Sequence, residues 1–282
     1  MYVLAPEKQQ TVLHMLIEGN SIRSTERLTR VHRDTIMSLL VRAGNLAGDM
    51  LYHRLRGLRL RHVEVDEIWT FVEKKQGHLG PYEDDLGRGD QYVFVAIDQD
   101  TKLIPTFLVG KRTGANAERF MLDLSERVTR PKAGEKIRMQ ISSDGFAAYP
   151  GAVDLAFANT VDYGVIVKDF REDMEQPGRY GPPVMTKAAR KVVIGDFDPY
   201  SITTSYAERN NLTMRTFLRR LTRLSLGFSK KLENLVAAVC LHMAHYNFCR
   251  RHSTLRMTPA MAAGVTDEIW SVGRLIEEIG LR

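Results

Sequence analysis

Four polar side chains recur at helical spacing in the segment 201–228. Each is separated from the next by three or four residues, so one helix would present them on a single face: Glu208, Asn211, Arg215 and Arg219. The opposite face carries an apolar stripe: Met214, Phe217, Leu218, Leu221 and Leu224. A carboxylate followed by arginines suits a divalent ion that binds a phosphate, while Asn211, Arg215 and Arg219 would contact the neighbouring DNA backbone. An ordinary solvated helix face has the same composition, so this segment alone leaves both interpretations open.

Metal chemistry needs further carboxylates, and two aspartates lie in predicted strands. The alternating pattern VEVDEIWTFV predicts a strand with Asp66 in its middle, and KIRMQISSDG predicts a strand that ends in Asp144. Three carboxylates held together with Glu208 would repel one another unless a divalent cation lay among them. Two such ions about 4 Å apart activate an attacking water or hydroxyl and stabilise the leaving oxygen.

Other carboxylates compete for these roles. Glu67 follows Asp66 directly, and strand alternation sends its side chain to the opposite face. Four further aspartates fall in segments that indicate turns or loops: Asp98, Asp100, Asp196 and Asp198. The residues therefore favour Asp66, Asp144 and Glu208 as the catalytic and metal-binding set.

The predicted order of elements explains how these three side chains could meet. Three antiparallel strands are followed by a helix, a strand, a short helix, a strand and then the long helix with Glu208. This is the order of an RNase H-like α/β fold with a mixed five-stranded sheet. In such a sheet the first and fourth strands are neighbours, so we expect Asp66 to lie beside Asp144.

The N-terminal segment indicates a helix-turn-helix. Helices are predicted over about 5–18, 21–28 and 33–42, and a small core is expected from apolar residues: Ile22, Leu28, Val31, Ile36, Leu39 and Leu40. His32, Arg33 and Thr35 begin the third helix, where a recognition helix contacts DNA. Three helices that pack without binding DNA would show the same pattern.

These segments divide the chain into four expected parts. They are a helix-turn-helix domain at 1–45, a basic linker or bridging helix at 46–62, the catalytic core at 63–228 and C-terminal helices with a tail at 229–282.

The charge distribution favours a polyanionic partner. The net charge is +6, and residues 209–256 hold ten Lys and Arg against one Glu. The only cysteines, Cys240 and Cys249, rule out a disulfide framework. The start of the chain lacks a signal-peptide pattern, and the longest apolar run is too short to span a bilayer, so we expect a cytoplasmic protein without a membrane segment.

Histidines near the two cysteines raise the question of a zinc site. On one helix His242, His245 and Cys249 would share a face, but Cys240 would point away. Four ligands do not converge, so packing is the better interpretation.

Several motifs together resemble the DDE transposases of bacterial insertion sequences, of the insertion-sequence-one kind, within the retroviral-integrase superfamily. They are VDEIW around Asp66, SSDGFAAY around Asp144, SITTSYAERNNLTMRTFLRRLTR around Glu208, and then FSKKLENLVAAVCLHMAHYNF and TLRMTPAMAAGVTD. The resemblance covers about residues 63–268. The best-known members carry a cysteine zinc-binding segment before the helix-turn-helix, whereas this chain has no cysteine before Cys240.

The resemblance implies a magnesium-dependent strand-transfer enzyme, in which manganese could substitute. Asp66, Asp144 and Glu208 would be the metal-binding triad, and Arg215 matches a position that contacts DNA ends. The expected partner is double-stranded DNA, both terminal inverted repeats and target, and joining two ends requires at least a homodimer. Two alternatives stay open at this point: a nuclease of the same fold that only hydrolyses, and a DNA-binding regulator without catalysis.

Overall fold

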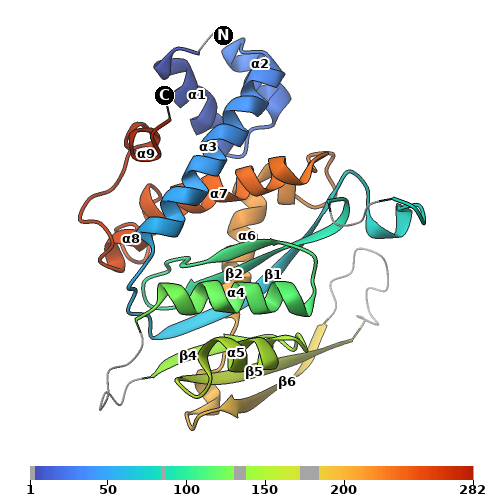
Figure 1. Ribbon diagram of the computed structural model, residues 1–282, viewed down its shortest axis with the longest axis vertical. Coiled ribbons are helices and arrows are strands. Elements are labelled where there is room, and N and C mark those ends of the chain that lie inside the picture. The colour runs from blue at the N-terminus through green and yellow to red at the C-terminus, as the bar shows by residue number, and fades with distance from the viewer. Residues whose placement is uncertain (1–3, 84–86, 130–137, 172–183, 282) are drawn as a thin grey trace.

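A six-stranded mixed sheet organises the computed structural model, which describes residues 4–83, 87–129, 138–171 and 184–281 (Figure 1). The strand order is β3-β2-β1-β4-β5-β6. The first three strands are antiparallel neighbours, β4 and β5 run parallel to β1, and β6 returns antiparallel to β5. The bounds are β1 His62–Val72, β2 Gly89–Asp98, β3 Phe107–Gly110, β4 Met139–Ser143, β5 Val161–Arg171 and β6 Val184–Ile194.

Helices cover both faces of this sheet. Helix α4 (Gly114–Arg127) and helix α5 (Tyr149–Phe157) lie side by side on the near face in Figure 1, and α6 (Ser205–Phe217) lies behind the sheet. Thr113 caps α4 by accepting a hydrogen bond from the backbone of Asn116. An apolar stripe of α4 is buried against the sheet: Phe120, Met121 and Leu124. The strand order and these two layers define an RNase H-like α/β core.

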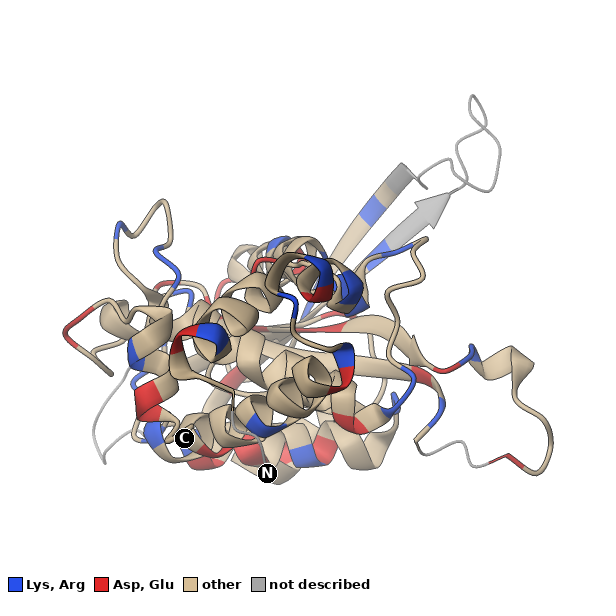
Figure 2. Ribbon diagram, turned by 90° about the horizontal axis from the view of Figure 1, so that it is seen from above, with Lys and Arg blue, Asp and Glu red and all other residues tan. Residues whose placement is uncertain are grey.

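The prediction of five strands missed β6. This strand contains Lys187, Arg190 and Lys191, and most of its described side chains are exposed. Among the described strands it pairs with β5 alone, at the edge of the sheet, so it shows no buried alternation that a sequence pattern could reveal. In Figure 2 this strand pair projects from the body of the molecule and carries basic positions.

The three predicted N-terminal helices are present. They are α1 (Pro6–Ile17), α2 (Ile22–Thr29) and α3 (Arg33–Arg54). Ser21 caps α2 by accepting from the backbone of Ser24, and the ring of His32 caps α3. Of the expected small core, Val31, Ile36, Leu39 and Leu40 are buried, whereas Leu28 is 63% exposed.

Helix α3 is longer than predicted, and the expected boundary at residue 45 falls inside it. It crosses α7 (Leu232–Phe248), as Figure 1 shows, and the two backbones approach closely at Gly44. A Cβ at Gly44 would lie 2.2 Å from the carbonyl oxygen of Ala237, so only glycine fits there. The close packing on α7 explains why the helix continues through a glycine that weakens it locally.

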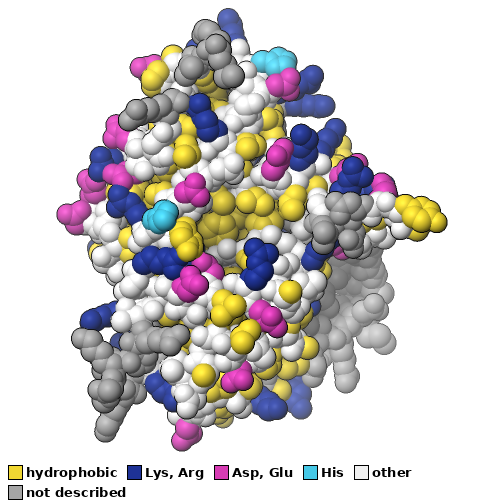
Figure 3. Space-filling view, viewed as in Figure 1, with side chains coloured by type: hydrophobic (Ala, Val, Ile, Leu, Met, Phe, Trp, Pro, Cys, Tyr) yellow, Lys and Arg dark blue, Asp and Glu magenta, His cyan; other side chains and the backbone are white. Residues whose placement is uncertain are grey.

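One hydrophobic core connects the N-terminal helices, the sheet and the C-terminal helices. Figure 3 shows apolar side chains gathered on one face at the level of α7. Two short C-terminal helices follow, α8 (Pro259–Ala262) and α9 (Val272–Glu278), and single 3-10 turns occur at Gln76–His78, Pro199–Ser201 and Arg219–Leu221. Within the described ranges, no helix combines the length and hydrophobicity needed to cross a bilayer.

The expectation of one helix over 201–228 was wrong. Helix α6 ends at Phe217, and Leu224 has a φ of 54° and is 88% exposed. Two hydrogen bonds turn the chain back at this point, from the Arg215 guanidinium to the carbonyl of Leu221 (3.0 Å) and from the Thr222 hydroxyl to the carbonyl of Arg215 (3.0 Å). Arg219 therefore lies beyond the helix that carries Glu208 and Asn211.

Candidate active site

Asp66 and Asp144 lie beside each other on adjacent strands, as the predicted strand order requires. The parallel register of β1 and β4 ends with Val65 opposite Ser143. Asp66 is the next residue on β1, and Asp144 is the first residue after β4. Asp144 accepts a hydrogen bond from the backbone of Phe146 (3.0 Å), which closes the turn after β4. Because Asp66 is in mid-strand and Asp144 follows a strand end, the sheet itself brings the two carboxylates together.

Two hydrogen bonds hold α6 against β1. Oε2 of Glu64 accepts from the backbone N–H of Ala207 (2.8 Å), and Oδ2 of Asp66 accepts from Nδ2 of Asn211 (2.6 Å). Glu64 and Asp66 are two residues apart, so their side chains leave the same face of the strand. The predicted face of α6 therefore lies over Asp66.

Glu208 lies on that face of α6, one turn before Asn211. Its carboxylate accepts from the hydroxyl of Thr204 (2.8 Å) and is paired with the ammonium of Lys168 on β5. The side chain is 51% exposed. Its charge raises the pKa of Asp66, so the two carboxylates interact electrostatically, although Glu208 is not part of the tightest acidic cluster.

The tightest cluster among the described residues is Asp66, Glu67 and Asp144, which offer oxygens within 4.8 Å of one another. Strand alternation does direct Glu67 to the α5 side, as predicted, where it faces Tyr149. Its carboxylate nevertheless lies close to those of Asp66 and Asp144. Nε of Arg112 lies 3.0 Å from Oε2 of Glu67, and its Nη2 lies 3.6 Å from Oδ2 of Asp144.

Arg112 is a site residue that the sequence patterns did not single out. It lies between β3 and α4, and its guanidinium stacks on Phe146 at 4.0 Å from the ring centroid. It neutralises part of the charge of Glu67 and Asp144. A basic residue in the segment GKRTG before a predicted helix gives no local signal for this role, because Glu67 and Asp144 lie far from Arg112 in the sequence.

Burial, with repulsion from neighbouring carboxylates, raises the pKa values of three acids on β1. Burial, followed by repulsion from Asp144, Glu67 and Glu208, raises the pKa of Asp66 to about 7. Burial also raises the pKa of Glu67 and of Glu64. An ionised carboxylate in such surroundings is costly unless a cation compensates it.

The donor set suits a hard divalent cation. Carboxylate oxygens are the ligands that Mg²⁺ prefers. Oε1 of Glu67 is buried and lacks a well-formed hydrogen bond to any described residue, although the Tyr149 hydroxyl is near enough to lower the pKa of Glu67. This oxygen is an acceptor without a strong donor, which is the state expected of a group near a cation site.

The predicted DNA-binding residues fall in separate places. His32, Arg33 and Thr35 are exposed together at the start of α3. Arg215 is partly buried, and burial, followed by repulsion from Arg223, lowers its pKa to about 10. Arg219 is exposed in the turn after α6.

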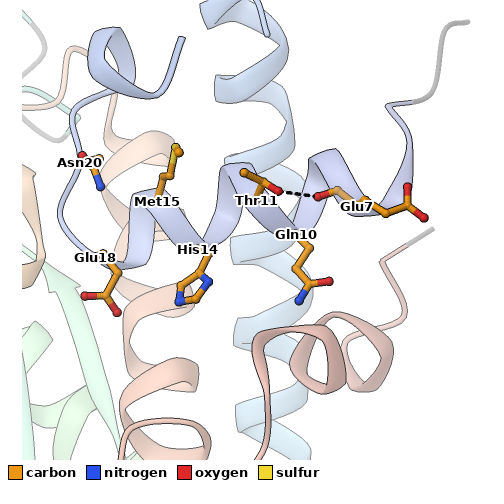
Figure 4. A pocket seen from close by; sticks show the side chains of 7 residues that line it. All are labelled: Glu7, Gln10, Thr11, His14, Met15, Glu18 and Asn20. Atoms are coloured by element: carbon orange, nitrogen blue, oxygen red, sulfur yellow. Dashed lines mark hydrogen bonds between the residues drawn. The ribbon is translucent and has the colours of Figure 1, made fainter. Parts of the chain in front are cut away.

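A shallow hollow along α1 has a volume of about 480 Å³. Figure 4 shows Gln10, His14 and Glu18 on the same side of that helix, with the Thr11 hydroxyl bonded to the carbonyl of Glu7. Of the described residues, two carboxylates and no Lys or Arg line it. Its charge does not suit a polyanion.

No family model matches the chain, and no curated protein matches it. Among solved structures, the crystal structure of the Mos1 mariner paired end complex with Mn matches at 14% identity and a TM-score of 0.25, over 58% of this chain and 59% of that one. The cryo-EM structure of the piggyBac transposase synaptic complex with hairpin DNA matches at 10% identity and a TM-score of 0.43, over 99% of this chain and 72% of that one. This chain thus spans about three-fifths of the Mos1 chain. Because both scores are low, the fold assignment rests on the strand order.

Proposed function

We propose that the chain is a DDE-type DNA transposase, of the bacterial insertion-sequence kind, that cleaves DNA strands and joins 3′ hydroxyl ends to target DNA. The observation that carries the proposal is that Asp66 and Asp144 lie together just beyond the last pair of the β1–β4 register, beneath a helix bonded to Asp66 through Asn211. Two acids on neighbouring strands and a third on a covering helix form a site for phosphoryl transfer with divalent ions.

Asp66, Asp144 and Glu208 are the proposed ligands of two Mg²⁺ ions, with Mn²⁺ as a substitute. Such ions, when bound, supply activation of the attacking hydroxyl and stabilisation of the leaving oxygen. Glu208 is favoured over Glu67 by its surroundings. Glu67 is nearly buried and is paired with Arg112, whereas the half-exposed carboxylate of Glu208 is paired with a single lysine that an ion can replace.

The chain's own residues have positioning roles in this proposal. Asn211 orients the carboxylate of Asp66, and Glu64 fixes the first turn of α6 over β1. Arg112 holds Asp144 from the other side. These contacts keep the acids in place before substrate binds, which reduces the cost of ordering them.

DNA recognition is proposed for the N-terminal helices. His32, Arg33 and Thr35 are exposed at the start of α3, as a recognition helix requires, and Arg215 and Arg219 lie near the end of α6. The partners are terminal inverted repeats and target DNA. Joining two ends requires two active sites, so we propose at least a homodimer that acts in the cytoplasm.

The test is a joining assay with purified full-length chain, labelled DNA ends from the repeats that flank its gene, a plasmid and Mg²⁺. We expect labelled ends covalently joined to plasmid, and no joining by Asp144→Asn, which keeps the size of the side chain. Cleaved ends without joined product would identify a nuclease instead. DNA binding without either product would contradict the enzyme assignment.

A further inference from the structure

A cleft of about 800 Å³ lies between the N-terminal helices and the segment that joins α6 to α7. Its walls come from the α1–α2 turn and the start of α3 on one side, and from residues 217–230 on the other. Figure 3 shows several Lys and Arg side chains on the upper right of the molecule, beside the N-terminal helices. The volume lies within the range of sites that hold small organic ligands.

The rim of the cleft is strongly basic. Among the described residues, five cationic side chains line it against one carboxylate, that of Asp34. The five are Arg23, Arg33, Arg219, Arg220 and Lys230. No carboxylate within the described ranges forms an ion pair with any of these five. The charge excess therefore favours an anionic ligand.

Arg220 is the most informative of these cations. Its guanidinium donates to the hydroxyl of Ser229 (2.7 Å) and contacts the sulfur of Met37 (3.6 Å). Burial lowers its pKa to about 10. A charge in this setting is costly without an anion, and a phosphate would supply one with the geometry that guanidinium prefers.

The floor of the cleft combines apolar surface with one unsatisfied polar ring. Phe217, Phe228 and Leu241 provide the apolar part. His242 is 3% exposed, and both of its ring nitrogens are buried without a hydrogen-bond partner in the described chain. Burial lowers its pKa to about 3, so the ring is neutral and offers one donor and one acceptor.

This set of groups matches a nucleotide. A phosphate needs cations, a base needs a flat apolar surface, and the edge of a base carries adjacent donors and acceptors. One helix, α6, also connects the cleft with the carboxylates. Asn211 contacts Asp66, and Phe217 lines the cleft six residues further along α6, which is about 9 Å at 1.5 Å per residue.

We propose that this cleft binds one unstacked nucleotide of the DNA strand held at the carboxylates. Arg220 binds its phosphate, Phe217 and Phe228 contact the base, and His242 bonds to the edge of the base. The inference rests on the proposed function, because it takes DNA as the substrate. It adds a base-binding subsite that joins the N-terminal helices to the catalytic sheet.

The experiment compares two single-stranded probes, an oligothymidylate and an abasic strand of equal length, in binding to the full-length chain. We expect the oligothymidylate to bind about 5- to 100-fold more tightly, since a stacked base contributes that much. His242→Leu should reduce this ratio and leave abasic binding unchanged. Arg220→Met should weaken both probes, whereas Arg274→Met, which removes a distant arginine paired with Glu278, should weaken neither.

Thermal denaturation of each variant separates a failure to fold from a loss of binding. Equal affinity for the two probes in a folded wild-type chain would overturn the inference. So would an unchanged ratio in a folded His242→Leu variant. Failure of the proposed function is distinct, because it would appear as absence of joining in the plasmid assay, whereas joining with no base preference contradicts the cleft alone.

Discussion

The carboxylate of Glu64, fully buried inside β1, accepts the backbone N–H of Ala207 in the first turn of α6 at 2.8 Å. The N-cap residue of this helix, Thr204, makes no capping hydrogen bond with its side chain. Glu64 therefore caps the N-terminus of α6 from a neighbouring strand. Its negative charge also interacts favourably with the positive end of the helix dipole. Since α6 carries Asn211 and Glu208, this one bond links the sheet to the covering acid.

We expect Glu64→Ala to lower the free energy of unfolding by about 1–3 kcal/mol, because it leaves the Ala207 N–H buried without an acceptor. Glu64→Gln should cost less, since its amide oxygen can still accept. Urea denaturation measures both. Glu118→Ala, at an exposed position of α4, is the control and should change little. Equal stability of Glu64→Ala and the wild-type chain would refute the anchoring role.

The raised pKa of Asp66 predicts that the stability of the chain depends on pH when divalent ions are absent. This pKa is raised from 3.8 to about 7, mainly by burial, so between these pH values the folded chain binds a proton that the unfolded chain has released. The contribution of Asp66 to stability is therefore present at low pH and is lost as the pH rises to about 7. Asp66→Asn does not titrate, so its stability relative to the wild-type chain should rise over this window.

The measurement is urea denaturation in EDTA at a series of pH values. Added Mg²⁺ should reduce the difference between the two chains near pH 7, because a bound cation compensates the ionised carboxylate. Parallel stability curves for the two chains from acid to neutral pH would show that Asp66 has an ordinary pKa.

Glu208 and Glu67 can be distinguished as the third ligand by matched substitutions. We expect Glu208→Gln to abolish joining, because it removes a ligand charge while keeping the shape of the side chain. Glu67→Gln should retain joining at reduced rate, because Glu67 contacts Arg112 and Tyr149 rather than the face beneath α6. Rates measured over a range of Mg²⁺ concentrations test this. The reverse pattern would make Glu67 the third ligand.

We expect Arg33 to make a salt-dependent contribution to the affinity for DNA. It is exposed at the start of α3, and its side chain forms no ion pair with a described residue. If Arg33 contacts a phosphate, Arg33→Ala should lower the slope of log affinity against log salt by about 1. Filter binding to the flanking repeats at several salt concentrations measures the slope, with Arg274→Ala as control. An unchanged slope would remove Arg33 from the interface.

Strand order and the Asp66–Asp144 neighbourhood could be predicted because they follow from hydrophobic patterning and from a known order of elements. The end of α6 at Phe217 could not be predicted in this way. Apolar residues keep helical spacing to Leu224, but hydrogen bonds between Arg215 and the following turn redirect the chain. The contacts of Glu64 and Arg112 join residues far apart in the chain, so no local pattern indicates them. Strand β6 lacked a signal because most of its described side chains face solvent.

The central claim is that Asp66, Asp144 and Glu208 bind divalent ions. The most direct measurement is an anomalous-scattering map of crystals grown with Mn²⁺. We predict manganese peaks bounded by these three carboxylates, with Glu208 released from Lys168. Manganese absent from the space between Asp66 and Asp144, with Arg112 still paired to Asp144, would contradict the account.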